Sequence, residues 1–118
     1  MIVGTGVDIT EVRRLRQAVE KWGDAFLRRV FNQDELETAK KRVSLYQHLA
    51  GRFAAKEAVF KALGDNDLGW KDVVIFNDNK GRPFCKILKK SGRKVNVQIS
   101  ISHVKNYATA LAIVTKKP

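Results

Sequence analysis

Four charged side chains interrupt a segment, residues 44–63, whose composition otherwise favours a buried helix. Its residues are strong helix formers without proline, and a glycine follows where a helix would end. At about 100° per residue, large apolar side chains cover one side and alanines cover much of the rest. Arg52 and Lys56 fall within the apolar side, whereas Glu57 and Lys61 lie one turn apart among the alanines. Because buried charges need partners, the pattern predicts either local ion pairs and basic side chains that reach the surface, or a charged functional site.

A second carboxylate, Asp8, belongs to a segment that alternates with a period of two and therefore predicts a strand over residues 1–9. One face of this strand carries Val3, Thr5, Val7 and Ile9, and the other carries Ile2, Gly4, Gly6 and Asp8. Two glycines on one face indicate close approach by a ligand or by another part of the backbone. Two interpretations follow: a ligand site beside Asp8, or a helix that crosses the small residues while Asp8 starts a turn.

A histidine follows another alternating segment. Residues 94–102 predict a strand that runs out at His103, and residues 107–115 predict the next strand, with alanines along one side. A histidine at the end of a strand is typical of a turn as well as of a ligand-binding residue. His103 therefore indicates a site only together with the charged helix and the strand that carries Asp8.

If Asp8 and Glu57 converge, their carboxylates suit Mg²⁺, which prefers a few protein oxygens together with water and phosphate oxygens. The sequence contains neither a Gly-x-x-x-x-Gly-Lys phosphate loop nor a Gly-x-Gly-x-x-Gly motif after a strand. Phosphate groups would therefore be held by the metal, by helix ends and by basic side chains. The side chains available for this are Arg52, Lys56, Lys61 and His103.

Composition restricts the class of protein. The chain has 118 residues, of which 44% are hydrophobic, which suits a single domain over residues 1–118. No apolar run approaches the ~20 residues that span a bilayer, so we expect a soluble, cytoplasmic protein that does not bind membranes. Cys85 is the single cysteine, which excludes an intramolecular disulfide. Twenty-three Lys and Arg against twelve Asp and Glu give a net charge of +11, which favours anionic partners: nucleic acid, coenzyme phosphates or an acidic protein.

The order of predicted elements indicates the α+β class, with an N-terminal strand, a helical block and then antiparallel strands. Helices are predicted at 11–22, 24–30, 33–42 and 44–63, and the later strands at 72–77, 83–89, 94–102 and 107–115. The first helix carries a group of arginines. These are Arg13, Arg14 and Arg16, with Arg28 a little further on. An apolar stripe on this helix consists of Leu15, Val19 and Trp22, and it would leave the arginines in solvent. The arginines would then form either a solvated face or a surface that recognises carboxylates.

Taken together, the motifs resemble a known family. They are Gly6-Val7-Asp8-Ile9, Phe53-Ala54-Ala55-Lys56-Glu57-Ala58 with Lys61-Ala62-Leu63-Gly64, and Ile101-Ser102-His103. In order and spacing they are similar to the small branch of the 4′-phosphopantetheinyl transferases, the holo-[acyl-carrier-protein] synthases. The resemblance covers essentially the whole chain, and the helix motif is its most specific part. It implies an α+β fold that assembles as a homotrimer.

The resemblance also implies a reaction. A serine hydroxyl of an apo acyl carrier protein attacks the pyrophosphate of coenzyme A, 4′-phosphopantetheine is transferred, and adenosine 3′,5′-bisphosphate leaves. Asp8 and Glu57 would bind Mg²⁺, Glu57 would accept the serine proton directly or through a metal-bound water, and Lys61 would stabilise or protonate the leaving phosphate. The coenzyme contacts implied are Arg42, Arg52, Lys56, Lys61 and His103. The arginines of the first helix would dock the acidic carrier protein, and Val104 departs from the family pattern, which has a small hydroxyl residue there.

Two other classes remain open at this point. A small basic α+β module that binds RNA would explain the charge. Aromatic residues are only 8% of the chain, however, and the sequence has no aromatic RNA-binding strand and no Gly-x-x-Gly loop. A non-catalytic trimeric scaffold would leave Asp8, Glu57 and Lys61 unexplained.

Overall fold

A computed structural model describes residues 1–64 and 67–118 of the chain. Its helices are α1 (Val12–Val30), α2 (Gln33–Lys40) and α3 (Leu45–Leu63), with short 3-10 helices at Trp70–Asp72 and Lys90–Lys94. The strands are β1 (Ile2–Glu11), β2 (Val73–Asn77), β3 (Pro83–Ile87), β4 (Val95–His103) and β5 (Tyr107–Lys116). This order confirms the predicted α+β class. Among the described residues, no helix combines the length and apolar composition that a membrane crossing requires.

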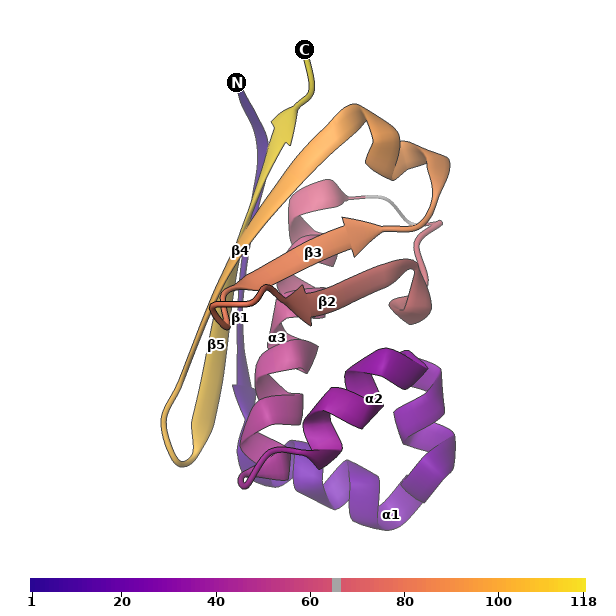
Figure 1. The fold of residues 1–118 in the computed structure, drawn as a ribbon, viewed down its shortest axis with the longest axis vertical. Coiled ribbons are helices and arrows are strands. Elements are labelled where there is room, and N and C mark those ends of the chain that lie inside the picture. The colour runs from indigo at the N-terminus through magenta and orange to yellow at the C-terminus, as the bar shows by residue number, and fades with distance from the viewer. Residues whose placement is uncertain (65–66) are drawn as a thin grey trace.

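The strands form two antiparallel sheets. In the larger sheet the order is β1-β5-β4, so β5 is central, and Asp8 pairs with Ala110, which pairs on its other side with Ile101. The second sheet is the β2–β3 hairpin. Helix α3 packs along one face of the larger sheet, while α1 and α2 gather around the N-terminal end of α3 (Figure 1).

Helix α3 lies against β1 at the two glycines. A β-carbon at Gly6 would lie 1.9 Å from the carbonyl oxygen of Ala58, and one at Gly4 would lie 1.9 Å from that of Ala62. Only glycine permits this approach of strand and helix. The structure therefore shows the helix crossing at the glycine face, and this crossing leaves a ligand site beside Asp8 open. Asp8 stays within β1 and does not start a turn.

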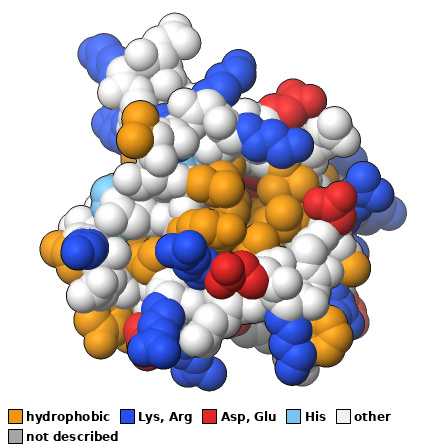
Figure 2. Space-filling view, turned by 90° about the horizontal axis from the view of Figure 1, so that it is seen from below, with side chains coloured by type: hydrophobic (Ala, Val, Ile, Leu, Met, Phe, Trp, Pro, Cys, Tyr) orange, Lys and Arg blue, Asp and Glu red, His pale blue; other side chains and the backbone are white. Residues whose placement is uncertain are grey.

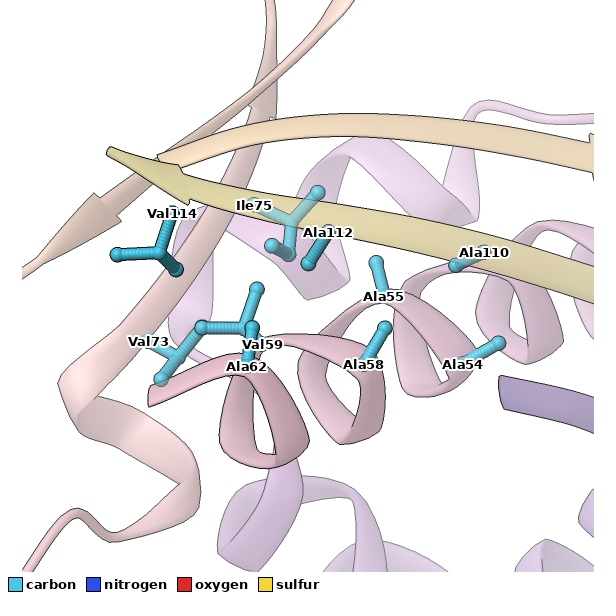
Figure 3. Packing of buried hydrophobic residues seen from close by; sticks show 10 residues of the cluster. All are labelled: Ala54, Ala55, Ala58, Val59, Ala62, Val73, Ile75, Ala110, Ala112 and Val114. Carbon is cyan, nitrogen blue, oxygen red and sulfur yellow. The ribbon is translucent and has the colours of Figure 1, made fainter. Parts of the chain in front are cut away.

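Small side chains also line the contact between α3 and the middle strand, β5. The main core cluster consists of Ala54, Ala55, Ala58, Val59, Ala62, Val73, Ile75, Ala110, Ala112 and Val114. Figure 3 shows the alanines of α3 directed towards those of β5, with branched residues closing the far end. Alanine against alanine lets the two backbones lie close together, so the position of α3 over the sheet is closely defined.

Helix α1 changes direction at Gly23, which has φ 57° and ψ −139° inside the helix. This is the left-handed region that glycine tolerates, and the change falls at the break predicted between residues 22 and 24. A second core cluster fills the space that α1, α2 and α3 enclose. Its members are Leu15, Val30, Phe31, Ala39, Leu49, Ala50 and Ala108.

The face of the larger sheet that points away from α3 is open. Its apolar side chains include Val7 and Leu111, which pair across β1 and β5 and are 60% and 43% exposed. Val3 and Ile9 extend the same apolar surface along β1. Neighbouring apolar side chains exposed on a sheet are typical of an interaction surface.

Candidate functional site

Asp8, Glu57 and Lys61 come together where α3 passes the outer edge of β1. The Lys61 ammonium donates to Asp8 Oδ1 at 3.3 Å and to the carbonyl oxygen of Val7 at 3.0 Å. The other oxygen of Asp8 accepts a hydrogen bond from the Thr10 hydroxyl at 3.0 Å. Glu57 lies one helical turn before Lys61 on the same side of α3. Strand and helix therefore hold two carboxylates and one ammonium in a single cluster.

The electrostatics of this cluster suit a cation. Burial raises the pKa of Glu57, the negative charge of Asp8 raises it further, and the positive charge of Lys61 opposes the rise. A divalent ion between the two carboxylates would relieve their repulsion. In the described part of the chain no group of three or more His, Cys, Asp or Glu side chains could hold a metal. Two carboxylates fit Mg²⁺, which completes its shell with water and substrate oxygens.

A second cluster of predicted residues lines a cavity of about 610 Å³ beside the start of α3. Its basic side chains are Lys41, Arg42, His48, Arg52 and His103, and its described lining contains no Asp or Glu. Arg52 is almost fully buried, and its guanidinium donates to Asn77 Oδ1 at 2.7 Å. A cavity with this charge suits a phosphate group.

His48 is a residue of this cavity that sequence reasoning missed. Among the described residues, its Nε2 atom is buried without a hydrogen-bond partner. Burial lowers the pKa of His48 to about 4, and the positive charges of Arg52, Arg42 and His103 add to this effect. A signal was present in the sequence, since His48 stands four residues before Arg52 and thus on the same helix face.

The two clusters lie on opposite sides of α3. At about 100° per residue, His48 and Arg52 are separated by roughly half a turn from Glu57 and Lys61. Lys61 contacts β1 at one edge of the sheet, whereas the cavity includes His103 at the end of β4, on the other edge. A single copy of the chain thus does not bring all the predicted coenzyme contacts together.

Lys56 corrects one prediction. Its side chain is fully buried, and its ammonium lies 2.8 Å from Glu35 Oε1, 2.8 Å from the carbonyl oxygen of Val30 and 3.0 Å from that of Trp70. Glu35 Oε2 accepts a further hydrogen bond from the amide of Ile75. All three protons of the ammonium have acceptors inside the protein. The assignment of Lys56 as a coenzyme contact is therefore wrong, and the residue joins α3 to its neighbours.

The predicted docking arginines are all exposed. They are Arg13, Arg14, Arg16 and Arg28 of α1. Arg16 pairs with Glu20 at 3.7 Å and lies over the ring of Tyr46. Leu15 is buried beneath them as expected, but Trp22 is exposed and does not belong to a buried stripe. Figure 2 views the molecule from the end where α1 and α2 lie, and shows a hollow with apolar side chains, surrounded by charged ones of both signs.

These features define an α+β protein with a paired-carboxylate site on a helix–strand edge, and comparison with known proteins identifies its family. The sequence model of the 4′-phosphopantetheinyl transferase superfamily matches residues 4–112. The chain belongs to this superfamily.

Individual relatives agree over nearly the full length. The holo-[acyl-carrier-protein] synthase of Protochlamydia amoebophila is 44% identical over 119 residues, covering 96% of this chain and 98% of the relative. Crystal structures of two further holo-[acyl-carrier-protein] synthases are also similar. The Bacillus anthracis enzyme, in complex with CoA (3′,5′-ADP), has a TM-score of 0.86 and 34% identity, with 99% of both chains covered. The Helicobacter pylori enzyme, in complex with coenzyme A, has a TM-score of 0.86 and 28% identity, covering 94% of this chain and 99% of the other.

Proposed function

We propose that this protein transfers 4′-phosphopantetheine from coenzyme A to a serine hydroxyl of an apo acyl carrier protein. The observation that carries the proposal is the cluster of Asp8, Glu57 and Lys61, which lies in a fold shared with synthases that bind coenzyme A. A non-catalytic scaffold needs no such cluster, because two facing carboxylates cost folding free energy unless a ligand uses them.

The chemistry follows from the positions of these side chains. The serine oxygen forms a bond to the phosphorus that carries the pantetheine arm, the bond from that phosphorus to the bridging oxygen breaks, and adenosine 3′,5′-bisphosphate leaves. Glu57, with its raised pKa, accepts the serine proton. Lys61 is half-exposed and free to move from Asp8 to the leaving phosphate, which it neutralises or protonates. Bound between Asp8 and Glu57, Mg²⁺ would supply positive charge to the pyrophosphate.

The nucleotide end of coenzyme A would occupy the basic cavity. Arg42, Arg52 and His103 supply positively charged or hydrogen-bonding groups there, and Lys61 supplies one at the other cluster. Because the two clusters lie on opposite sides of α3, we propose that one coenzyme lies between two copies of the chain. One copy then supplies the carboxylates and its neighbour supplies the cavity.

A closed ring of three copies satisfies this arrangement. Each copy presents a β1 edge to the β4 edge of the next, and the exposed apolar face with Val7 and Leu111 becomes buried around the symmetry axis. We therefore predict a homotrimer. Light scattering at assay concentrations should give three times the monomer mass, and Leu111→Glu should shift the mass to that of one copy with loss of transfer. A fully active monomer would rule out the shared site.

The direct test is incubation with coenzyme A, Mg²⁺ and an apo acyl carrier protein, followed by mass spectrometry of the carrier. We expect the mass increment of one phosphopantetheine and the release of adenosine 3′,5′-bisphosphate. A carrier whose acceptor serine is replaced by alanine is the matched control. If the carrier keeps its mass under conditions in which the chain binds coenzyme A, the transferase proposal is wrong.

A further inference from the structure

His48 occupies an unusual place in the basic cavity. The residue lines a space of about 610 Å³, yet within the described structure its Nε2 atom is buried and makes no hydrogen bond. Buried polar atoms without partners are uncommon in folded proteins, and each one calls for a ligand, a water or a functional reason. The inference that follows rests on the proposed function, because it concerns the nucleotide end of the same coenzyme.

We propose that His48 takes up a proton when a phosphate monoester enters the cavity, and that the resulting imidazolium binds the phosphate beside Arg42 and Arg52. His48 is thereby a residue that selects nucleotides with a terminal phosphate monoester over those without one.

The surroundings of His48 favour an anion from every side. Arg52 lies one turn along α3, Arg42 belongs to the connection between α2 and α3, and His103 stands at the end of β4. Lys41 lines the same cavity, and the described lining has no carboxylate to neutralise these groups. One negative charge opposes this effect: against the lowering by burial, Glu35 raises the pKa of Arg52. The Glu35 carboxylate is, however, already paired with Lys56. The excess of positive charge is therefore left for a ligand.

The same surroundings explain why protonation awaits the ligand. Without a bound anion, burial and the positive charges of Arg52 and Arg42 keep the pKa of His48 near 4, so the ring is neutral at pH 7. A phosphate monoester brings nearly two negative charges and strong acceptor oxygens. Both raise the pKa of an adjacent imidazole, since an opposite charge and a hydrogen bond to the charged form each favour that form. A phosphodiester brings a single charge and has a smaller effect.

The test is isothermal titration calorimetry of the wild-type protein with adenosine 3′,5′-bisphosphate and with dephospho-coenzyme A, which carries no phosphate monoester, in buffers of different ionisation heat. At about pH 8 the monoesters have lost their second proton, so any proton taken up goes to the protein. We expect measurable proton uptake with the bisphosphate and much less with dephospho-coenzyme A. His48→Phe, which fills similar space, should abolish the uptake and weaken bisphosphate binding by about tenfold, the range of one charge-assisted hydrogen bond. Binding of dephospho-coenzyme A should change little.

Two further variants assign the proton. His48→Gln, which keeps a hydrogen-bond donor but cannot titrate, should recover part of the affinity without proton uptake. His103→Gln should weaken binding while proton uptake persists. The proposal is overturned if His48→Phe binds the bisphosphate as tightly as the wild type, or if the uptake disappears in His103→Gln and remains in His48→Phe. Failure of the wild type to bind either nucleotide would instead count against the transferase function.

Discussion

Asp8 and Glu57 do not have the same surroundings, and the difference bears on their roles. Asp8 already has partners for both oxygens, Lys61 on one and Thr10 on the other. Glu57 has a raised pKa caused by burial and by the charge of Asp8. We infer that Asp8 mainly orients a metal ion, while Glu57 is both a ligand and the better proton acceptor.

Replacing each carboxylate by its amide tests the proposed site directly. Asp8→Asn and Glu57→Gln should each reduce transfer by about 10²-fold or more, because each removes a charge that the metal and the proton transfer need. Both variants should keep the wild-type melting temperature within a few degrees, since the replacements have almost the same shape. Rates of carrier modification across a Mg²⁺ titration would measure the effect. Undiminished turnover of the wild type in excess chelator would refute the metal site.

The second prediction concerns pH. At the proposed site a metal ion would bind the ionised form of Glu57, so Mg²⁺ affinity should fall as the pH drops through the raised pKa of this residue, by about tenfold per pH unit for one competing proton. The acid limb should therefore begin above the pH range of an ordinary carboxylic acid. Asp8→Asn removes the second cause of the raised pKa, so the NMR titration of Glu57 should shift to lower pH in that variant. An unchanged titration would show that Asp8 does not act on Glu57.

Some residues of the site could be predicted from the sequence, and others could not. Asp8, Glu57 and Lys61 could be grouped in advance because period-two and 3.6-residue patterns place side chains on faces. Lys56 was misassigned because periodicity places its charge on a buried helix face but does not identify the partner of that charge. The partner is Glu35, which is distant in the sequence. His48 was missed because an imidazole beside an apolar stripe looks ordinary until the cavity around it is seen.

At the scale of elements, the buried pair Lys56–Glu35 links α3 to α2 and, through Ile75, to β2. Lys56→Met should leave the Glu35 carboxylate buried without its cation, and we predict a loss of about 3–5 kcal/mol in the free energy of unfolding. Urea denaturation followed by circular dichroism would measure it. The double variant Lys56→Met, Glu35→Gln should be more stable than Lys56→Met alone, because no buried charge remains. A single variant as stable as the wild type would contradict this role.

The elements themselves were largely predictable, because local patterns specify them. The break in α1 falls at Gly23 as expected, and the strands after α3 follow their alternation closely. The main difference is Trp22, which the apolar stripe of α1 placed inside the protein and the structure leaves 60% exposed. Trp22 is the last residue before Gly23, where the helix changes direction.

Across the whole molecule, we propose that the excess of positive charge serves two surfaces, one for the carrier protein and one for the coenzyme, which can be separated by mutation. Arg14→Glu lies on the exposed side of α1, so it should weaken use of the acidic carrier, with a steep dependence on salt, while coenzyme binding stays nearly intact. Lys61→Glu lies in the reacting cluster and should reduce kcat while carrier docking persists. Rates measured against carrier concentration at several salt concentrations report carrier docking, and calorimetry with coenzyme A reports coenzyme binding. Together they distinguish the effects of the two variants. Equal loss of coenzyme binding in both variants would mean that the surfaces are misassigned.

The glycine contact between β1 and α3 also restricts the sequences that this enzyme can reach by mutation. A side chain at Gly6 would meet the carbonyl oxygen of Ala58, next to Glu57 in the chain, and Gly6 itself stands two residues before Asp8. Any replacement there pushes apart the strand and the helix that carry the two carboxylates. We therefore expect evolution to vary the residues around the site more readily than Gly6, because a side chain there would meet the carbonyl oxygen of Ala58. The close contact between β1 and α3 thus limits which substitutions are tolerated beside the two carboxylates.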